Sequence, residues 1–281
     1  FLVDNDGKFA AFMLNEEADK LISLKSDINA LFNSPVLGYN SKDDIVYQFW
    51  ANRDSHEVYY FDPKTDYAPT TAISSISWDD PNFPNIEGFG VWAAKCNFTM
   101  GPDGKMYSRM LGGNLVRIDV ENARGENLTN GDLVGTKDGS AYGLVFDPQD
   151  ENVFYFSNND KHCIYKYDLR TKECACWAGQ EGKSGYLDGP IGQAMFNKPG
   201  QMCVDSEGNI ILTDTENHCI RKITMSTGYV TTLAGKPQNS GYVNGSAEDA
   251  QFKKPLGICI DNDDVMYILS LIHISEPTRR S

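Results

Sequence analysis

The segment Gly185-Tyr-Leu-Asp-Gly189 returns as Gly241-Tyr-Val-Asn-Gly245, 56 residues further along the chain. Three more pairs of segments keep the same offset: Ala194-Met-Phe196 with Ala250-Gln-Phe252, Lys198-Pro199 with Lys254-Pro255, and Cys203-Val-Asp205 with Cys259-Ile-Asp261. A fixed offset held over four separate matches indicates an internal repeat. Residues 185–268 therefore contain one repeat unit and much of the next, and the rest of the chain is interpreted from them.

One repeat unit predicts four short strands. Apolar runs at 201–204, 210–214, 219–223 and 229–233 alternate with turn-forming segments. In the first of these turns Gly208 supplies a positive φ, and the flanking Asp and Asn residues tolerate the same conformation. Four short strands with tight turns, repeated along a chain, are typical of the blades of a β-propeller.

Six hairpins of this kind follow one another along the chain. They begin near residues 1, 37, 98, 144, 205 and 261, and each has Asp, Asn, Gly or Pro between two apolar runs. A third strand recurs at 58–62, 115–119 and 164–168. We expect an all-β fold, a six-bladed β-propeller formed by residues 1–268 as a single domain. Residues 10–31 are acidic and irregular, so the first blade is the hardest to place.

Both ends of the chain are expected to be truncated. The sequence opens at Phe1 within a strand-like run, and the last blade stops before its strands are complete. Residues 269–281 do not continue the repeat and resemble the in-frame translation of a sequencing adapter. We therefore expect residues 269–281 to be a non-native tail, outside the fold.

Charge and composition exclude some classes of function. The chain has 281 residues, 41% of them hydrophobic, and a net charge of −14. Nucleic-acid binding needs a basic stripe for phosphate contacts, and the sequence has none. No run of apolar residues approaches the ~18 that a transmembrane helix requires. The chain is thus expected to bind neither nucleic acid nor the membrane interior.

The repeat unit resembles a known family. Phe196-Asn-Lys-Pro199, Asp205-Ser-Glu-Gly-Asn209, Thr213 to Lys222 and Val230 to Gly235 together resemble an NHL repeat. The long connection with Gly-Tyr-x-Asp-Gly is similar to that of bacterial cell-surface propellers of this family, which often follow an immunoglobulin-like TIG domain. This resemblance implies an extracytoplasmic or cell-surface, non-enzymatic binding module that presents one propeller face to a glycan or protein partner.

Two connections between blades are the best candidates for a binding surface. We call residues 178–190 the first linker and residues 234–245 the second linker. Each returns from an outer strand to the next inner strand, and so crosses one face of the propeller. Exposed Tyr with Asn, Asp and Gln suits sugar or peptide contacts. The candidate ligand-binding residues are Lys183, Tyr186, Asp188, Lys236, Gln238, Asn239, Tyr242 and Asn244. The alternative is a clasp between neighbouring blades.

An enzyme is the second hypothesis. Lactonases of similar six-bladed shape hold calcium in the channel with oxygen ligands, which hard cations prefer. Residues expected to face the channel are Asn40, Asn97, Gln201, Cys203, Cys259, Asp147, Asp205 and Asp261. The three aspartates occupy equivalent positions at the first turn of their blades, where Asp is favoured for turn geometry alone. No cofactor is predicted under the binding hypothesis, and calcium is possible under this alternative.

Histidine, cysteine and tryptophan are interpreted as structural. His56, His162 and His218 enter the third strand of three different blades, too far out to share one zinc ion, so we expect each to tie its turn to a neighbouring segment. Most of the seven cysteines are expected to be small buried hydrophobic residues, with a metal or redox role for Cys174 and Cys176 as a minor alternative. Trp50, Trp92 and Trp177 are expected to pack within blades.

Overall fold

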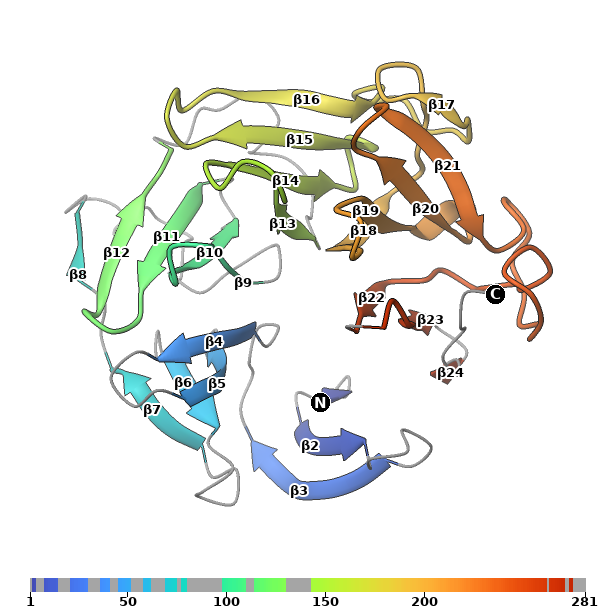
Figure 1. Ribbon diagram of the computed structural model, residues 1–281. Coiled ribbons are helices and arrows are strands. Elements are labelled where there is room, and N and C mark those ends of the chain that lie inside the picture. Colours follow the sequence, from blue (N-terminus) through green and yellow to red (C-terminus); the bar gives the residue numbers. More distant parts are fainter. Residues whose placement is uncertain are drawn as a thin grey trace. The chain divides into compact units, whose positions relative to one another are not determined.

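The four strands predicted for the repeat unit are all present in the computed structural model of the protein (Figure 1). They are β18 (Pro199–Val204), β19 (Ile210–Asp214), β20 (Cys219–Thr224) and β21 (Tyr229–Ala234), each antiparallel to the next. A single 3-10 turn, Thr215–Asn217, joins β19 to β20. The sequence did not indicate a short fifth strand, β17 (Gly189–Pro190), which pairs with the outer edge of β21.

The structure describes residues 2–3, 8–14, 21–29, 36–40, 45–51, 58–61, 69–74, 77–79, 98–109, 114–129, 143–261, 263–270 and 273–274. The chain divides into two compact units, residues 1–110 with 115–127 and residues 111–114 with 128–281. The two units are described separately below.

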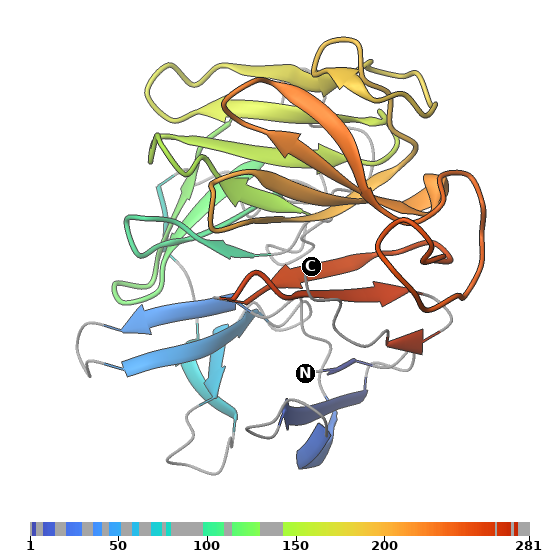
Figure 2. The same cartoon turned by 45° about the vertical axis from the view of Figure 1, so that its right-hand side comes forward.

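The second unit contains three sheets. The first is built from β13 (Leu144–Phe146), β14 (Val153–Asn158), β15 (Cys163–Asp168) and β16 (Cys174–Gly179). The sheet of β17–β21 follows, and the third holds β22 (Gly257–Ile260), β23 (Met266–Ser270) and β24 (His273–Ile274). The innermost strands of successive sheets contact one another, β13 with β18 and β18 with β22 (Figure 2).

Apolar side chains fill the spaces between these sheets. The two repeats place the same residue types at equivalent positions of this packing. Phe196 and Phe252 are buried at equivalent positions, each below the glycine that opens a linker. Gly179 and Gly235 adopt φ of 93° and 92°, and a Cβ on either would come within 2.9 Å of the phenylalanine ring beneath it. Glycine is therefore required at both positions by conformation and by space. The linkers begin in the same way in both repeats.

The first unit also holds three sheets. One is β1 (Leu2–Val3), β2 (Lys8–Leu14) and β3 (Leu21–Asn29), and the next is β4 (Val36–Asn40), β5 (Ile45–Ala51), β6 (Val58–Phe61) and β7 (Pro69–Ile73). The last runs in the order β8 (Ser77–Trp78), β12 (Arg124–Asn127), β11 (Leu115–Asp119), β10 (Met106–Arg109) and β9 (Thr99–Met100). A core that includes Phe49, Val58, Met106 and Ile118 lies between the second and third of them.

All six predicted hairpins are confirmed, because each of the six sheets in the described residues contains one of them. The fold is all-β and of the propeller class, and the number of blades stays a prediction. The description of residues 10–31 as irregular was wrong, since β3 occupies 21–29. Leu269 and Ser270 complete β23 in the expected tail, and the origin of residues 269–281 stays a prediction.

Candidate functional site

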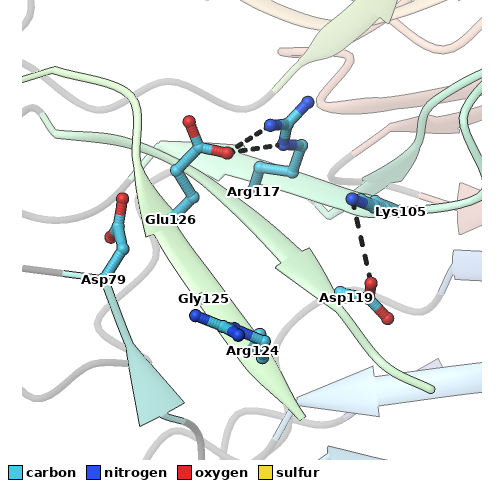
Figure 3. A pocket seen from close by; sticks show the side chains of 7 residues that line it. All are labelled: Asp79, Lys105, Arg117, Asp119, Arg124, Gly125 and Glu126. Atoms are coloured by element: carbon cyan, nitrogen blue, oxygen red, sulfur yellow. Dashed lines mark hydrogen bonds and ion pairs between the residues drawn. The ribbon is translucent and has the colours of Figure 1, made fainter. Parts of the chain in front are cut away.

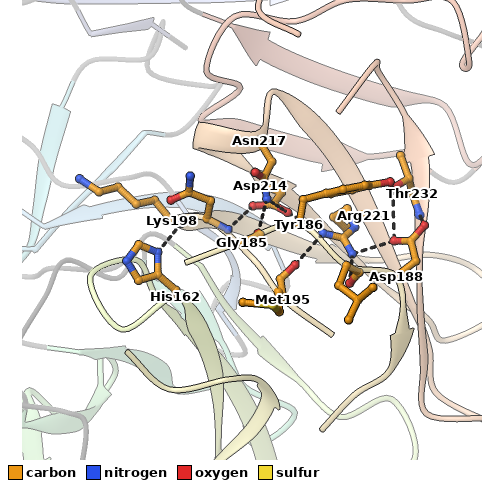
Figure 4. A network of polar contacts seen from close by, with 12 residues as sticks. His162, Gly185, Tyr186, Asp188, Met195, Lys198, Asp214, Asn217, Arg221 and Thr232 are labelled. Atoms are coloured by element: carbon orange, nitrogen blue, oxygen red, sulfur yellow. Dashed lines mark hydrogen bonds and ion pairs between the residues drawn. The ribbon is translucent and has the colours of Figure 1, made fainter. Parts of the chain in front are cut away.

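A buried arginine of β20, Arg221, binds the first linker (Figure 4). Arg221 is fully buried and donates to two carboxylates, with Nη1 2.6 Å from Asp214 Oδ2 and Nη2 2.7 Å from Asp188 Oδ1. It also donates to the backbone oxygens of Met195 at 3.1 Å and Leu187 at 2.9 Å. The Arg221 guanidinium therefore joins β19 and β20 to the first linker, which precedes them in the chain.

The remaining polar groups of this linker complete the same network. Asp188 Oδ2 accepts from the backbone N–H of Thr232 at 3.0 Å, and the hydroxyl of Tyr186 lies 2.7 Å from the Thr232 hydroxyl. The Arg221 guanidinium sits over the Tyr186 ring, 4.9 Å from its centroid. Two predicted binding residues, Tyr186 and Asp188, thus fasten the first linker to β20 and β21 of a single sheet. The binding role and the clasp between neighbouring blades both stay predictions for them.

Asp214 is fully buried, as is its partner Arg221. Its other partners are the backbone N–H of Asn197 at 2.7 Å and the side-chain amide of Asn217 at 2.9 Å. Burial raises the pKa of Asp214 to about 6, and the Arg221 guanidinium opposes that rise. A buried carboxylate of this kind depends on its partner, because an isolated buried charge is strongly destabilising.

The second linker presents its side chains to solvent. Lys236, Gln238, Asn239 and Asn244 are exposed, and Tyr242 is 48% exposed beside Val243 at 45%. Its side chains make local contacts: Lys236 Nζ is 3.6 Å from Asp249, and Asn239 donates to the carbonyl of Pro237 at 3.1 Å. Lys183 of the first linker is also exposed, 3.4 Å from Gln180 Oε1. Five of the eight candidates therefore gather on one exposed segment.

Gln238 has a backbone conformation that is unfavourable for its side chain. Its φ is 63°, whereas the equivalent position of the first linker is Gly182, with φ 75°. Both are anchored in the same way, by a backbone N–H that donates at 2.8 Å to Asn217 O and to Lys161 O respectively. A non-glycine residue in the left-handed region costs on the order of 1 kcal/mol, and such strain tends to accumulate at functional positions. Sequence reasoning had not detected this position as strained.

The aspartates expected near the channel hold turns. Asp147, Asp205 and Asp261 each accept from the backbone N–H two residues ahead, at 2.9, 3.2 and 2.9 Å. Their second oxygens accept from Tyr155 at 2.7 Å, Lys222 at 3.0 Å and Tyr267 at 3.1 Å. The turn role predicted for these three residues is confirmed, and calcium stays a prediction of the alternative hypothesis.

The other predicted channel residues are placed as follows. Gln201 Oε1 accepts from the Ile258 backbone N–H at 3.2 Å and so joins β18 to β22. Cys203 is half-buried and Cys259 is exposed. Asn40 is described only by its backbone in β4, and Asn97 lies outside the described residues. Within the described ranges, no three His, Cys, Asp or Glu side chains form a group able to hold a metal ion.

The structural role predicted for histidine is confirmed for two residues. The backbone N–H of Lys198 donates to His162 Nδ1 at 3.1 Å, and that of Lys254 donates to His218 Nδ1 at 3.1 Å. Each histidine, with φ near +60°, thus ties the start of its third strand to the inner strand of the next sheet. His56 lies outside the described residues.

Cysteine and tryptophan also have largely structural environments. Cys163 and Cys219 are fully buried, as predicted, whereas Cys259 is exposed. Trp177 packs against the Tyr155 ring with 4.2 Å between centroids, which confirms its role within the blade. The side chain of Trp50 and all of Trp92 are outside the described part of the chain.

A charged hollow of about 190 Å³ lies in the first unit (Figure 3). Its walls carry three basic and three acidic side chains: Lys105, Arg117, Arg124, Asp79, Asp119 and Glu126. Most of these charges are already paired, since Arg117 Nε donates to Glu126 at 3.0 Å and Lys105 Nζ lies 3.8 Å from Asp119. Four of the six charged side chains around the hollow are therefore engaged with one another.

Comparison with known proteins agrees with the architecture. The family model described as NHL repeat matches residues 196–223, the unit built from β18, β19 and β20. The chain has a β-propeller fold that carries an NHL repeat at residues 196–223. Protein SUPPRESSOR OF QUENCHING 1, chloroplastic, of Arabidopsis thaliana is 25% identical over 260 residues, which are 85% of this chain and 24% of that protein. The chain thus spans about a quarter of that relative.

Two solved structures from Bacteroides thetaiotaomicron share the fold. A structural genomics protein of unknown function has a TM-score of 0.70 at 21% identity, covering 94% of this chain and 64% of the other. An auxiliary nutrient binding protein has a TM-score of 0.67 at 20% identity, covering 92% and 60%. At these identities the likeness shows the fold alone. In the described part of the chain, no helix is long and apolar enough to cross a membrane.

Proposed function

We propose that this protein is an extracytoplasmic binding module that takes a neutral oligosaccharide on its second linker. The similarity in fold to an auxiliary nutrient binding protein supports a binding role. That neighbour comes from Bacteroides thetaiotaomicron, and this source supports a location outside the cytoplasm. The observation that carries the proposal is Gln238, an exposed side chain at φ 63° where the first linker has glycine.

The chemistry of the second linker favours a neutral sugar. Gln238, Asn239 and Asn244 offer uncharged amide donors and acceptors, which match hydroxyl groups without a charge to desolvate. The half-exposed Tyr242 adds an aromatic face with a polar tip, a surface on which a sugar ring can stack. In the first linker the residues equivalent to Asn239 and Asn244 are Lys183 and Asp188, and Asp188 is already bound to Arg221.

Gln238→Gly separates binding from folding. The change restores the residue of the first linker and relieves an unfavourable φ, so we expect stability to be unchanged or higher by up to about 1 kcal/mol. We expect the same variant to lose oligosaccharide affinity at least tenfold, because its amide contacts the ligand. Binding of the wild type and variants to a panel of neutral oligosaccharides, measured by isothermal titration calorimetry, tests this.

Tyr242→Ala should also weaken binding, and Tyr229→Ala is its matched control. Tyr229 is 45% exposed, nearly as much as Tyr242, but belongs to β21 rather than to the linker. Equal losses in both variants, or binding that survives Gln238→Gly and Tyr242→Ala, would contradict the proposal. A partner protein that crosslinks through the second linker while every oligosaccharide fails would replace the sugar with a protein ligand.

A further inference from the structure

The second linker carries an Asn-Gly pair, Asn244-Gly245, whose reactive groups are unoccupied. Both residues are exposed, and they follow Val243, whose backbone pairs with that of Gln251. Within the described residues, no hydrogen bond engages the Asn244 side-chain amide or the Gly245 backbone N–H. The side-chain carbonyl carbon of Asn244 and the backbone nitrogen that follows it are therefore both open to water and to each other.

The equivalent pair in the first linker, Asp188-Gly189, is held on both sides. Asp188 Oδ1 accepts from Arg221 Nη2 at 2.7 Å, and Asp188 Oδ2 accepts from the backbone N–H of Thr232 at 3.0 Å. Gly189 is buried in β17, where it pairs with Val230 of β21. The same position of the repeat is thus fixed in the first linker and open in the second.

The open pair can react with itself. Glycine has no Cβ, so its backbone nitrogen can come close to the side-chain carbonyl carbon of the residue before it. A Cβ at position 245 would have the Cβ of Asp249, 3.3 Å away, as its nearest neighbour. Rotation of Asn244 and Gly245 breaks no hydrogen bond at either reacting group, so a local rearrangement costs little free energy.

We propose that Asn244-Gly245 is a self-modification site that converts Asn244 to aspartate and isoaspartate. The Gly245 nitrogen loses its proton to solvent and attacks Asn244 Cγ. The bond from Cγ to the amide nitrogen breaks, and this nitrogen leaves as ammonia after it takes a proton from water. A five-membered imide remains, and one water molecule opens it. Cleavage at Cγ gives aspartate, and cleavage at the backbone carbonyl carbon gives isoaspartate.

The product places a carboxylate where the first linker has Asp188. Arg221 compensates the charge of Asp188, whereas the new carboxylate lies in solvent. A neutral and polar segment thereby becomes negatively charged, which is the kind of change by which a covalent modification alters a surface. The inference goes beyond oligosaccharide binding and does not rest on it, because the reaction needs only the chain and water.

Incubation of the full chain in mildly alkaline buffer, followed by peptide mapping with detection of isoaspartate, tests the proposal. We expect the peptide that contains Asn244 to change from amide to acid, with both products present and a rate that rises with pH, because the attacking nitrogen must lose its proton. Asn239-Ser240 of the same linker should react roughly tenfold more slowly, because a Cβ follows the asparagine. Mapping separates the other Asn-Gly pair, Asn130-Gly131, which lies outside the described residues.

Asp188→Asn is the matched control, because it creates a second Asn-Gly pair at the equivalent position of the repeat. In the folded variant we expect position 188 to react roughly tenfold more slowly than Asn244, since Gly189 is held in β17. In urea, where both linkers are unfolded, the two positions should react at similar rates. Gly245→Ala should slow the reaction at Asn244 roughly tenfold.

Three results would overturn the proposal: conversion of Asn244 no faster than that of Asn239, aspartate without isoaspartate, or equal rates at positions 188 and 244 in folded Asp188→Asn. Urea denaturation of each variant shows which molecules are folded. The reaction is followed without any oligosaccharide, so a failure of sugar binding leaves this result unaffected, and a failure of the reaction leaves sugar binding untouched.

Discussion

The two linkers begin alike and then diverge. Each has, near its start, a glycine with φ near +92° above a buried phenylalanine. In each of the two sheets that precede the linkers, the histidine before the third strand accepts from a backbone N–H ahead of the next sheet. The first linker is then fastened to its blade through Asp188 and Arg221. The second has Asn244 in place of Asp188 and exposes its amides and Tyr242 to solvent.

This difference shows how a repeat can separate stability from binding. The backbone frame is set by residues common to both repeats, the glycines, phenylalanines and histidines. Substitutions at the remaining linker positions then decide whether the polar side chains face inward to a buried cation or outward to a ligand. Function in such a fold is located in the residues that depart from the repeat.

The largest loss of stability is expected from removal of Arg221, the buried cation of β20 that binds the first linker. Arg221→Met leaves Asp214 buried without its charged partner, and we expect a loss of about 3–5 kcal/mol of unfolding free energy. Urea denaturation at neutral pH measures it. The effect should be confined to the first linker, so binding by the second linker should persist wherever the variant remains folded.

A double variant distinguishes lost charge pairing from lost packing. Arg221→Met with Asp214→Asn removes both charges, so the buried carboxylate no longer needs compensation. We expect the double variant to be more stable than Arg221→Met alone. Equal stabilities would mean that the arginine acts through its packing against Tyr186 and Phe196, whose ring centroids lie 4.9 and 5.1 Å from its guanidinium carbon.

The sequence was sufficient to predict the strands of the repeat, because their apolar alternation and turn residues are local signals. It predicted β19 with the bounds that the structure shows and missed β3. In that segment Ile22, Leu24 and Ile28 fall at alternating positions, a strand pattern that the surrounding charges obscured. Local periodicity was therefore present, and the error was to weigh composition above it.

The sequence could not assign the linker residues to opposite roles. Asp188 and Asn244 are equivalent in the repeat, and the role of Asp188 depends on its contact with Arg221, 33 residues further on. The available signal was Arg221 itself, a charged residue at an inward position of β20 between Cys219 and Ile223. A charge at an inward strand position requires a buried partner, and that requirement does not identify which carboxylate supplies it.

Asp188 and Asn244 occupy equivalent positions in the two linkers. Exchanging one residue type for the other should change stability less than the loss of Arg221, and by different amounts in the two linkers. In Asp188→Asn the amide retains one acceptor oxygen where the carboxylate used two, for Arg221 and for the Thr232 N–H. One of these bonds is lost, and we expect a cost of about 2 kcal/mol. Asn244→Asp places a carboxylate in solvent and should change stability by less than about 0.5 kcal/mol.

Thermal and urea unfolding of both exchanges would test that asymmetry. Asn244→Asp should also weaken the binding of a neutral oligosaccharide, because a charge must then be desolvated. If both exchanges cost the same, the clasp around Arg221 would not be what separates the linkers.

The smallest loss of stability is expected from changes of His162 and His218, which the two repeats have in common. Burial lowers the pKa of His162 and His218, so between pH 6.5 and their lower native pKa values the unfolded chain binds more protons than the native protein. Their contribution to stability is therefore present above pH 6.5 and is lost as the pH falls, because a protonated Nδ1 cannot accept from the lysine N–H.

His162→Ala and His218→Ala should each cost about 1 kcal/mol at pH 7.5. Denaturation at pH 7.5 and pH 5 should show the difference from wild type shrink in acid, equally for both variants. A difference that is constant with pH would assign these side chains to packing, and unequal slopes would reveal a second divergence between the repeats.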